Sequence, residues 1–542
     1  VDNTNSLYTE KLYATSNPTL LENSKKGKYT ETRGEERQTY GDVMLNLSKT
    51  FKEKFSLDAH IGASIKDNRF DELSVYGPIA GAPNIFNVVN LDKSQKKTPK
   101  TGWHEQTQSF FYSLELGWKS QLFVTTTGRN DWASQLANSP QKSFFYPSVG
   151  VSWLPSSTFN FPEKFNYLKI RASWASVANP FPRELTIATH PYDDTISGWD
   201  DKSNYPIGQL YPERTKTWEL GFDARFLHGF TLSASWYRAD TYNQTFNPNL
   251  SASSGYSDIY IQTGHVRNTG VEASLGYDHQ WKNWNWNSQF TFSWNKNKII
   301  ELCKEWYNPI TEETITMNRL QISKLGRAKF ILKEGGSMGN LYSTTDLRRD
   351  DKGNIEIDEG GNVVVEDNLP DMKLGSVFPD YNLAWRNSVS WKNLNLGFLV
   401  TARIGGIVNS LTQANMDLFG VSEATAAARD AGGALVNGRS LVNPETWYTA
   451  IASQGGIPQY YTYSATNVRL QELSLGYTIP RKWLHNVCSI TVSFVGRNLW
   501  MMYCKAPFDP EAVASTNNFY QGMDYFMMPS TRNLGFNINI KF

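Results

Sequence analysis

The acidic stretch at residues 346–371 has the residue types that come nearest to a metal-binding motif. From Asp350 it reads DDKGNIEIDEGG, with oxygen-bearing side chains at alternating positions, as in loops that bind calcium. The twelfth position counted from Asp350 is a glycine, where a calcium loop needs a bidentate glutamate. Residues 355–365 read as two short strands around a Gly-Gly turn. We therefore expect a small extracellular hairpin, with a structural calcium ion in the 350–361 loop as the alternative.

Few catalytic signatures occur in the sequence. No H-E-x-x-H or P-loop pattern occurs, and none of the seven histidines lies three or four residues from another. Three cysteines, at 303, 488 and 504, are too few and too far apart for a disulfide framework or a zinc site. With 53 basic and 52 acidic residues, bulk charge gives no support for nucleic-acid binding. We expect neither an enzyme nor a nucleic-acid-binding protein.

Aromatic side chains in the long polar segments are the candidate substrate-binding residues. Such rings stack on sugar rings or on peptide side chains. The alternative interpretation is an upper aromatic girdle, or loop packing against a partner protein. These candidates are Trp199, Tyr205, Tyr211, Trp306, Tyr307, Trp447 and Tyr448.

The elements that would hold these loops are predicted to be strands. The final strand shows the alternation of apolar and polar residues most clearly. From Leu534 to Phe542, apolar residues alternate with Gly, Asn and Lys, which gives one apolar and one polar face. The chain ends on the aromatic Phe542, which suits the closing strand of a membrane barrel better than an exposed soluble edge. We count roughly fifteen such segments, each near the ~9–11 residues that a tilted strand needs to cross a bilayer.

The connections between these segments alternate between short and long. Short turns are predicted at residues 52–54, 119–120, 227–229 and 392–393. This is the rule for outer-membrane barrels, which have short periplasmic turns and long extracellular loops. The long loops are predicted near residues 66–104, 133–143, 179–211, 245–262, 298–379, 406–465 and 501–529.

Composition agrees with a transmembrane antiparallel β-barrel. Hydrophobic residues make up 40% of the chain and mean hydropathy is −0.48, with no apolar run of the length that a helical span requires. Aromatic residues reach 14%, as expected if they form girdles at both membrane interfaces. Charged residues on the polar faces suit a solvated lumen, although a catalytic or proton-carrying set is the alternative. They are Asp58, Glu115, Arg171, Asp223, Glu272 and Arg403.

Several motifs, in order along the chain, resemble the SusC-like (RagA-like) TonB-dependent transporters. Residues 210–223 (LYPERTKTWELGFD) are similar to the barrel strand L-x-P-E-x-T-x-T-x-E-x-G-x-D of that family. The strongest match is GRNLW at 496–500 followed by FDPE at 508–511, whereas MMYC at 501–504 departs from the usual Thr-rich sequence. Further matches are NTGVE at 268–272, NKNK at 295–298, FPD at 378–380, Gly405-Gly406, VRL at 468–470, LSLGY at 473–477, Arg532 and Phe542.

The resemblance implies an energy-coupled importer of bulky nutrients, either glycans or oligopeptides, in the outer-membrane lipid. It implies a SusD-like surface lipoprotein as a lid, TonB acting through a plug segment, and Phe542 as the C-terminal signal for barrel assembly. Family members have about 22 strands around a plug. We therefore interpret residues 1–542 as the C-terminal part of a larger barrel, with the plug and the partner strand of the last strand outside this chain. A passive porin-type diffusion channel is the alternative function.

Overall fold

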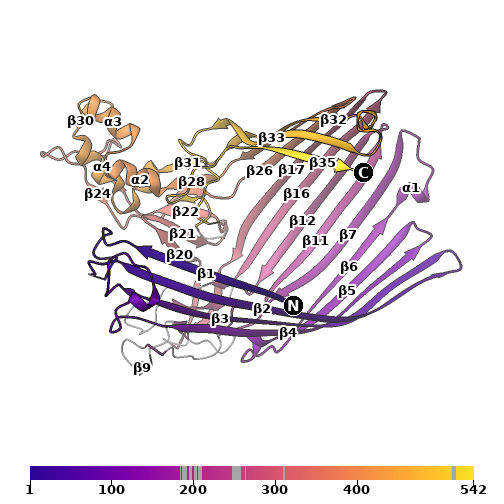
Figure 1. The fold of residues 1–542 in the computed structure, drawn as a ribbon, viewed down its shortest axis with the longest axis horizontal. Helices are drawn as coiled ribbons and strands as arrows, with labels where there is room; N and C mark the ends of the chain where they lie inside the picture. The colour runs from indigo at the N-terminus through magenta and orange to yellow at the C-terminus, as the bar shows by residue number, and fades with distance from the viewer. Residues whose placement is uncertain are drawn as a thin grey trace.

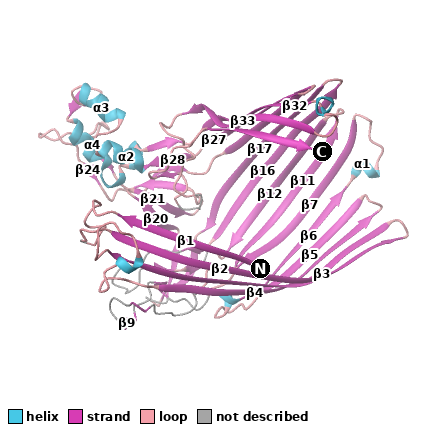
Figure 2. Cartoon of the chain, viewed as in Figure 1, coloured by secondary structure: helices cyan, strands magenta, loops and turns pink. Residues whose placement is uncertain are grey.

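The computed structural model describes the chain except for residues 23, 184, 186–191, 194–197, 200–203, 206–209, 247–257, 263, 309–311 and 516–519. Its main feature is an antiparallel sheet of sixteen strands that follow one another in chain order (Figure 1, Figure 2). The strands are β1 (Asp2–Leu12), β2 (Lys28–Phe51), β3 (Phe55–Pro78), β4 (Lys100–Trp118), β5 (Leu122–Ala133), β6 (Phe144–Trp153), β7 (Phe165–Asn179), β11 (Glu213–Phe226), β12 (Phe230–Tyr242), β16 (His265–Trp281), β17 (Trp284–Glu301), β26 (Tyr381–Trp391), β27 (Leu394–Ile404), β32 (Asn467–Ile479), β33 (Ser489–Cys504) and β35 (Asn533–Lys541). Among the described residues, no helix is both long and apolar enough to cross a membrane.

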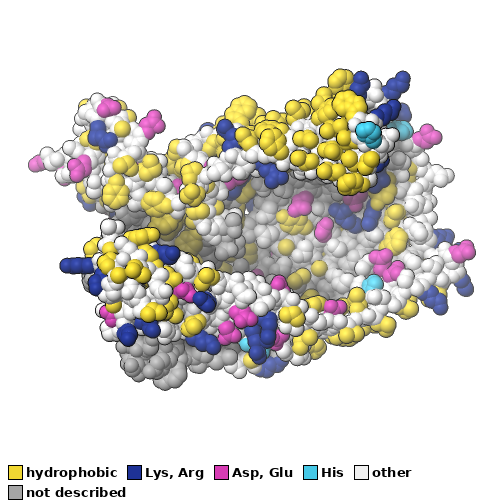
Figure 3. All heavy atoms as spheres, viewed as in Figure 1, with side chains coloured by type: hydrophobic (Ala, Val, Ile, Leu, Met, Phe, Trp, Pro, Cys, Tyr) yellow, Lys and Arg dark blue, Asp and Glu magenta, His cyan; other side chains and the backbone are white. Residues whose placement is uncertain are grey.

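The sheet curls around a hollow interior, which Figure 3 shows between the two edge strands. These edges are β1 and β35, and Figure 1 shows them facing each other across a gap. The last strand pairs with β33 from Ser489 opposite Lys541 to Arg497 opposite Asn533. Within the described residues, its other side has no partner strand.

Where the wall faces lipid, its strands have an outer apolar face and an inner polar face, as the period-two pattern predicted. On β12, Leu232, Ala234 and Trp236 lie on the outer face, and Ser233 and Ser235 line the interior. The outer side chains are exposed to the surroundings of the sheet, with Trp218 at 56% and Leu220 at 52% on the neighbouring strand β11. An exposed apolar band around a polar lumen is the arrangement of a barrel in lipid.

Short turns join the strands at one end of the sheet, at the positions that the sequence predicted. Lys52 and Glu53 have φ values of 48° and 57°, and Lys119 and Ser120 have 50° and 53°, which is the left-handed backbone of tight hairpins. Large apolar residues face each other where each hairpin closes, as in an aromatic girdle at a membrane interface. These pairs are Phe51–Phe55, Trp118–Leu122, Phe226–Phe230, Trp281–Trp284 and Trp391–Leu394.

At the opposite end the strands differ from the prediction in two respects. The loop expected near residues 66–104 is shorter, because β3 continues to Pro78 and β4 begins at Lys100. The sheet also contains β1, which the alternation pattern missed and which pairs with the upper half of β2 between Lys28 and Gln38. These extensions carry polar residues on both faces, because strands that rise above the membrane meet water on both sides.

Three long connections fold together into a separate unit, which we call the loop domain, at residues 302–380, 405–466 and 505–532. Its four-stranded sheet contains β20 (Arg319–Leu325), β21 (Ala328–Lys333), β22 (Asn340–Ser343) and β25 (Met372–Ser376), all from the first connection. A three-stranded sheet joins the second and third connections through β31 (Thr462–Ser464), β28 (Ile407–Ser410) and β34 (Met523–Asp524). The helices are α2 (Leu411–Leu418), α3 (Glu423–Asp430) and α4 (Pro444–Ala452). Figure 1 shows these helices beyond the end of the barrel wall.

The loop domain has apolar cores of its own. One contains Phe330, Leu341 and Val377, each with no exposed surface, and the other contains Ile457 and Tyr461. The shorter elements outside the large sheet are β8 (Tyr192–Asp193), β9 (Gly198–Trp199), β10 (Asn204–Tyr205), β13 (Thr245–Phe246), β14 (Asp258–Ile259), β15 (Ile261–Gln262), β18 (Cys303–Asn308), β19 (Glu313–Met317), β23 (Asp346–Leu347), β24 (Val365–Glu366), β29 (Ala434–Val436), β30 (Ser440–Val442), and the helix α1 (Pro155–Thr158).

The two faces of β12 lead to a prediction about stability in lipid. Ala234→Arg places a charge in the middle of the outer apolar band and should lower the free energy of unfolding by about 2–4 kcal/mol. Ser235→Arg, one residue along on the inner face, should lower it by less than about 1 kcal/mol. Urea unfolding of the full-length protein in lipid vesicles measures both values. Equal losses for the two variants would contradict the assignment of the faces.

Candidate functional site

The inner face of the barrel wall forms a concavity of about 690 Å³. It is lined by residues from β7, β12, β16, β17, β26, β27 and β32, together with a residue from the segment that follows β33. Charges of both signs reach it, from Arg171, Glu272, Arg403 and Glu511. The first three are among the polar-face residues that the sequence assigned to a solvated lumen. Serine and threonine side chains fill much of the remaining surface, which suits a neutral or mixed-charge solute.

Ion pairs and hydrogen bonds fix the positions of the two arginines at this concavity. Arg171 on β7 donates to Asp223 on β11 at 2.6 Å and lies 3.7 Å from Glu219, and Ser233 donates to the other oxygen of Asp223 at 2.6 Å. Arg403 on β27 donates from Nη2 to the carbonyl oxygen of Val377 at 2.8 Å. The Arg171 and Asp223 side chains are about one-third exposed, as expected for charges that face water in a lumen.

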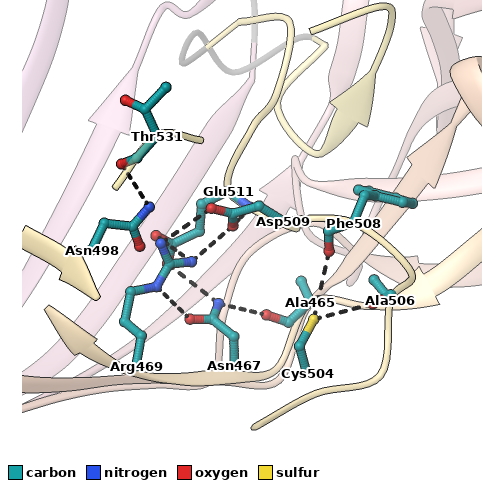
Figure 4. A network of polar contacts seen from close by, with 10 residues as sticks. All are labelled: Ala465, Asn467, Arg469, Asn498, Cys504, Ala506, Phe508, Asp509, Glu511 and Thr531. Atoms are coloured by element: carbon teal, nitrogen blue, oxygen red, sulfur yellow. Dashed lines mark hydrogen bonds and ion pairs between the residues drawn. The ribbon is translucent and has the colours of Figure 1, made fainter. Parts of the chain in front are cut away.

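At the top of β32, a buried ion pair ties the wall to the loop that follows β33 (Figure 4). The Arg469 guanidinium donates from Nη2 and Nη1 to the two carboxylate oxygens of Asp509 at 2.8 and 3.2 Å, and Glu511 lies 3.1 Å from Nη2. The Arg469 side chain is only 6% exposed. Burial by itself would raise the pKa of the Asp509 carboxyl, but the hydrogen bonds from Arg469 outweigh it and hold this pKa below its usual range.

This pair gives a structural reason for two of the sequence motifs. Arg469 belongs to the VRL stretch and Asp509 to the FDPE stretch, and a two-pronged guanidinium–carboxylate contact requires both side chains. Asn467 supports the pair, because its Oδ1 accepts from Arg469 Nε at 3.2 Å. The sequence marked both motifs as typical of the family, and it contained no sign that they meet.

The candidate substrate-binding aromatics lie at several separate places. Trp199, Tyr205 and Trp306 have backbone positions in β9, β10 and β18, and their side chains lie outside the described residues. Tyr211 and Tyr307 are 43% and 56% exposed, on different connections.

Trp447 and Tyr448 belong to α4 and pack against the apolar core of the loop domain. The Trp447 ring meets the Tyr460 ring edge-on at 5.9 Å. This packing lies within the chain itself, and a substrate-binding role for Trp447 and Tyr448 stays a prediction.

The acidic stretch forms two consecutive tight turns. The Asp350 carboxylate accepts from the backbone N–H of Asn354 at 2.8 Å, and the Asp358 carboxylate accepts from that of Asn362 at 2.8 Å. Ile357 pairs with Val363 around the Gly-Gly turn, as the predicted hairpin requires. Each of the two carboxylates thus closes its own turn, and a calcium ion in the 350–361 loop stays a prediction.

The loop domain has exposed apolar residues that the sequence did not indicate. Leu435 on β29 and Leu441 on β30 face each other across this two-stranded hairpin and are 65% and 61% exposed. Phe419 and Val421, between α2 and α3, are 75% and 68% exposed. Large apolar side chains exposed on a water-facing unit are typical of a protein contact surface. The short segments that carry them have no periodic pattern that would have distinguished them in the sequence.

Together, the meander of paired strands, the outer apolar band and the polar interior define an integral β-barrel of the bacterial outer membrane. The family model described as "TonB dependent receptor-like, beta-barrel" matches residues 2–499, so the chain belongs to this family. The resemblance drawn from the motifs is thereby confirmed.

Relatives support the same assignment. TonB-dependent receptor P3 of Formosa agariphila is 26% identical over 96% of this chain and 55% of that receptor. TonB-dependent receptor SusC of Bacteroides thetaiotaomicron is 22% identical over 69% of this chain and 38% of that receptor. The solved structure of the RagAB peptide transporter has a TM-score of 0.74 at 18% identity and covers all of this chain and 59% of that one, which shows a shared fold. The chain spans about half the length of three of the curated relatives it matches.

The Arg469–Asp509 pair gives a prediction about the rim of the barrel. Arg469→Met leaves the Asp509 carboxylate buried without its partner and should lower stability by about 3–5 kcal/mol. The double variant Arg469→Met/Asp509→Leu should recover part of this loss, because it removes both charges. The loss of the pair should free the segment that follows β33 from the wall. Faster protease cleavage near residues 505–515 of the folded full-length protein measures this change. Equal cleavage of the single and double variants would contradict the assigned pair.

The lowered pKa of Asp509 predicts a dependence on pH. The stabilisation is present above the unfolded-state pKa of about 3.9 and is lost as the pH falls through the lower pKa of the folded state. Asp509→Asn should therefore lower stability by about 1–3 kcal/mol near neutral pH, and its difference from the wild type should shrink below about pH 4. Unfolding measured across this range tests the prediction. A difference that does not change with pH would contradict it.

Proposed function

We propose that this chain forms the barrel wall of a TonB-energised importer of bulky nutrients, either glycans or oligopeptides, and that it is not an enzyme. The observation that carries the proposal is the polar concavity in the lumen, overhung by a folded loop domain, in a barrel of the TonB-dependent receptor family. A concavity of about 690 Å³ is in the range of sites for sizeable ligands. Its hydroxyl groups and paired charges offer hydrogen bonds to sugar hydroxyls or to peptide groups.

The proposal includes a SusD-like surface lipoprotein as the partner of the loop domain. The exposed leucines of the β29–β30 hairpin, with Phe419 and Val421, supply an apolar contact surface on the water-facing side. The name of one structural neighbour, the RagAB peptide transporter, supports a peptide as one of the two ligand classes. A ligand would then be enclosed between the lipoprotein and the lumen, near the candidate aromatics of the loops.

Energy coupling separates this proposal from a passive porin. Accumulating a large solute needs work, and TonB pulling on a plug segment of the full-length protein would supply it. Cells that express the full-length protein should take up a fluorescent oligosaccharide or oligopeptide ligand only when TonB is present. Uptake that persists in a strain without TonB would contradict the proposal. The full-length protein should conduct little in planar bilayers, because a plugged barrel blocks ions, and porin-like conductance would favour the passive channel.

The lipoprotein contact can be tested by substitutions in the β29–β30 hairpin of the loop domain. Leu435→Asp/Leu441→Asp should weaken co-purification of the full-length protein with its SusD-like lipoprotein by about tenfold or more, since each buried leucine contributes about 1.5–3 kcal/mol. The control is Leu20→Asp/Val89→Asp, which changes two exposed apolar residues, at 58% and 88%, near the β1–β4 end of the sheet. Equal binding by the two double variants would rule out the β29–β30 hairpin as the contact.

A further inference from the structure

The outer face of the wall changes from apolar to basic at one level of four adjacent strands, β11, β12, β16 and β17. These strands lie side by side in Figure 1. Rows of residues that face each other across the strand pairs show the change. The last apolar row is Leu220, Trp236, Val271 and Trp294. The next row outward is Trp218, Arg238, Thr269 and Lys296, and the row beyond it is Lys216, Asp240, Arg267 and Lys298.

These residues lie on the outer face because the register of the strands is continuous. No bulge interrupts β12 between Phe230 and Tyr242 in its pairing with β11 or β16, so Arg238 and Asp240 share a face with Trp236. The pairing of β16 with β17 shifts only beyond this region, at His265. Including Arg214, which bonds to Ser176 on β7 at 2.9 Å, six cations form what we call the basic patch. The basic patch is Arg214, Lys216, Arg238, Arg267, Lys296 and Lys298.

Few negative charges balance the basic patch. Asp240 accepts from Arg238 Nε at 2.9 Å and from Arg267 Nε at 2.7 Å, and Glu301 lies opposite His265 at its upper limit. Among the residues that the structure describes, Lys216, Lys296 and Lys298 are in no ion pair. All three are exposed. The patch therefore presents an uncompensated positive charge to whatever surrounds the barrel.

The charge excess is local to these strands. At the same end of the outer face of β3, Asp67, Arg69 and Asp71 alternate in sign, and Asp67 pairs with His104 on β4 at 2.7 Å. On β7, beside the basic patch, the outer residues are Ser176 and Ala178. If these charges only kept the rim of the barrel solvated, the net charge of the outer face should be similar around the whole wall. It differs between β3, β7 and the basic patch.

The height of the basic patch matches the headgroup layer of a bilayer. Successive rows on one face lie two residues apart, which at a strand tilt of about 40° is a rise of about 5 Å. The headgroup region extends roughly 5–7 Å beyond the hydrocarbon on each side. The first basic row thus lies within this layer. The second lies about 10 Å beyond the last apolar row, just outside the layer, from where long lysine side chains reach back to phosphate groups.

We propose that the basic patch binds phosphate-bearing headgroups of the outer-leaflet lipid. Three unpaired ammonium groups just above apolar and indole side chains contact a headgroup phosphate and its acyl chains at the same time. An acidic protein partner is the competing occupant. The patch continues directly into the lipid-facing band, so such a partner would have to lie within the membrane plane.

The test compares two triple variants of the full-length protein. Lys216→Gln/Lys296→Gln/Lys298→Gln removes the unpaired charges of the patch. Lys25→Gln/Lys93→Gln/Lys96→Gln removes the same charge from exposed lysines outside the patch. Each protein is reconstituted in vesicles of phosphatidylcholine with a small fraction of dansyl-labelled phosphatidic acid or dansyl-labelled phosphatidylcholine. Energy transfer from tryptophan to dansyl measures the enrichment of each labelled lipid around the barrel.

The wild type should enrich phosphatidic acid over phosphatidylcholine, and the patch variant should lose about threefold or more of that preference. The control variant should keep it. Raising the salt to about 1 M should reduce the wild-type preference, since the Debye length falls to about 3 Å. A wild type without a preference, or equal losses in both variants, would overturn the proposal. The wild-type salt dependence needs no variant, so the proposal can be rejected even if a substitution impairs folding.

Discussion

Hydrogen bonding of the backbone in hydrocarbon is the constraint on which the rest of this structure depends. Inside a bilayer no water satisfies a free N–H or C=O group, so each spanning segment must pair along its length with its neighbours. The sixteen strands pair in chain order, from β1 to β35, without a crossover, and within the described residues only the two edge strands have a single neighbour. Irregular backbone then has to lie outside the membrane, and the long connections, with the loop domain that three of them form, occur at one end of the wall.

The same constraint gives the two faces of the wall their separate roles. Alternate side chains of a strand point in opposite directions. Because Leu232 and Trp236 face lipid, Ser233 and Ser235 must face the lumen. The bulge within β32, between Leu470 and Glu472, resets this alternation near the rim and leaves Arg469 on the inner side, next to Asp509. A local irregularity of the strand thus places the ion pair that holds the segment after β33 against the wall.

The sequence predicted the wall well, because period-two alternation and tight turns are local properties. The fold class, the short turns and most strands could be found in this way. It missed β1, whose residues are mostly polar, because that strand pairs with β2 above the membrane and alternation carries no information there. It could not show that residues 302–380 and 405–466 share a core, since contacts such as Gln459 with Thr345 join positions far apart in the chain. The sequence could not place Trp447 and Tyr448 in this core for the same reason, since they pack with Leu347 and Val363 from the other connection.

The separate core of the loop domain has a consequence for how such proteins diversify. Phe330 and Ile457 are buried in apolar clusters whose members all belong to the loop domain. Selection on the outward surface of this unit is therefore decoupled from selection on membrane insertion. A lineage can replace the outward surface of this unit by drift or recombination within the three connections and retain an unchanged scaffold beneath it. Sequence divergence between paralogues should then concentrate above the rim.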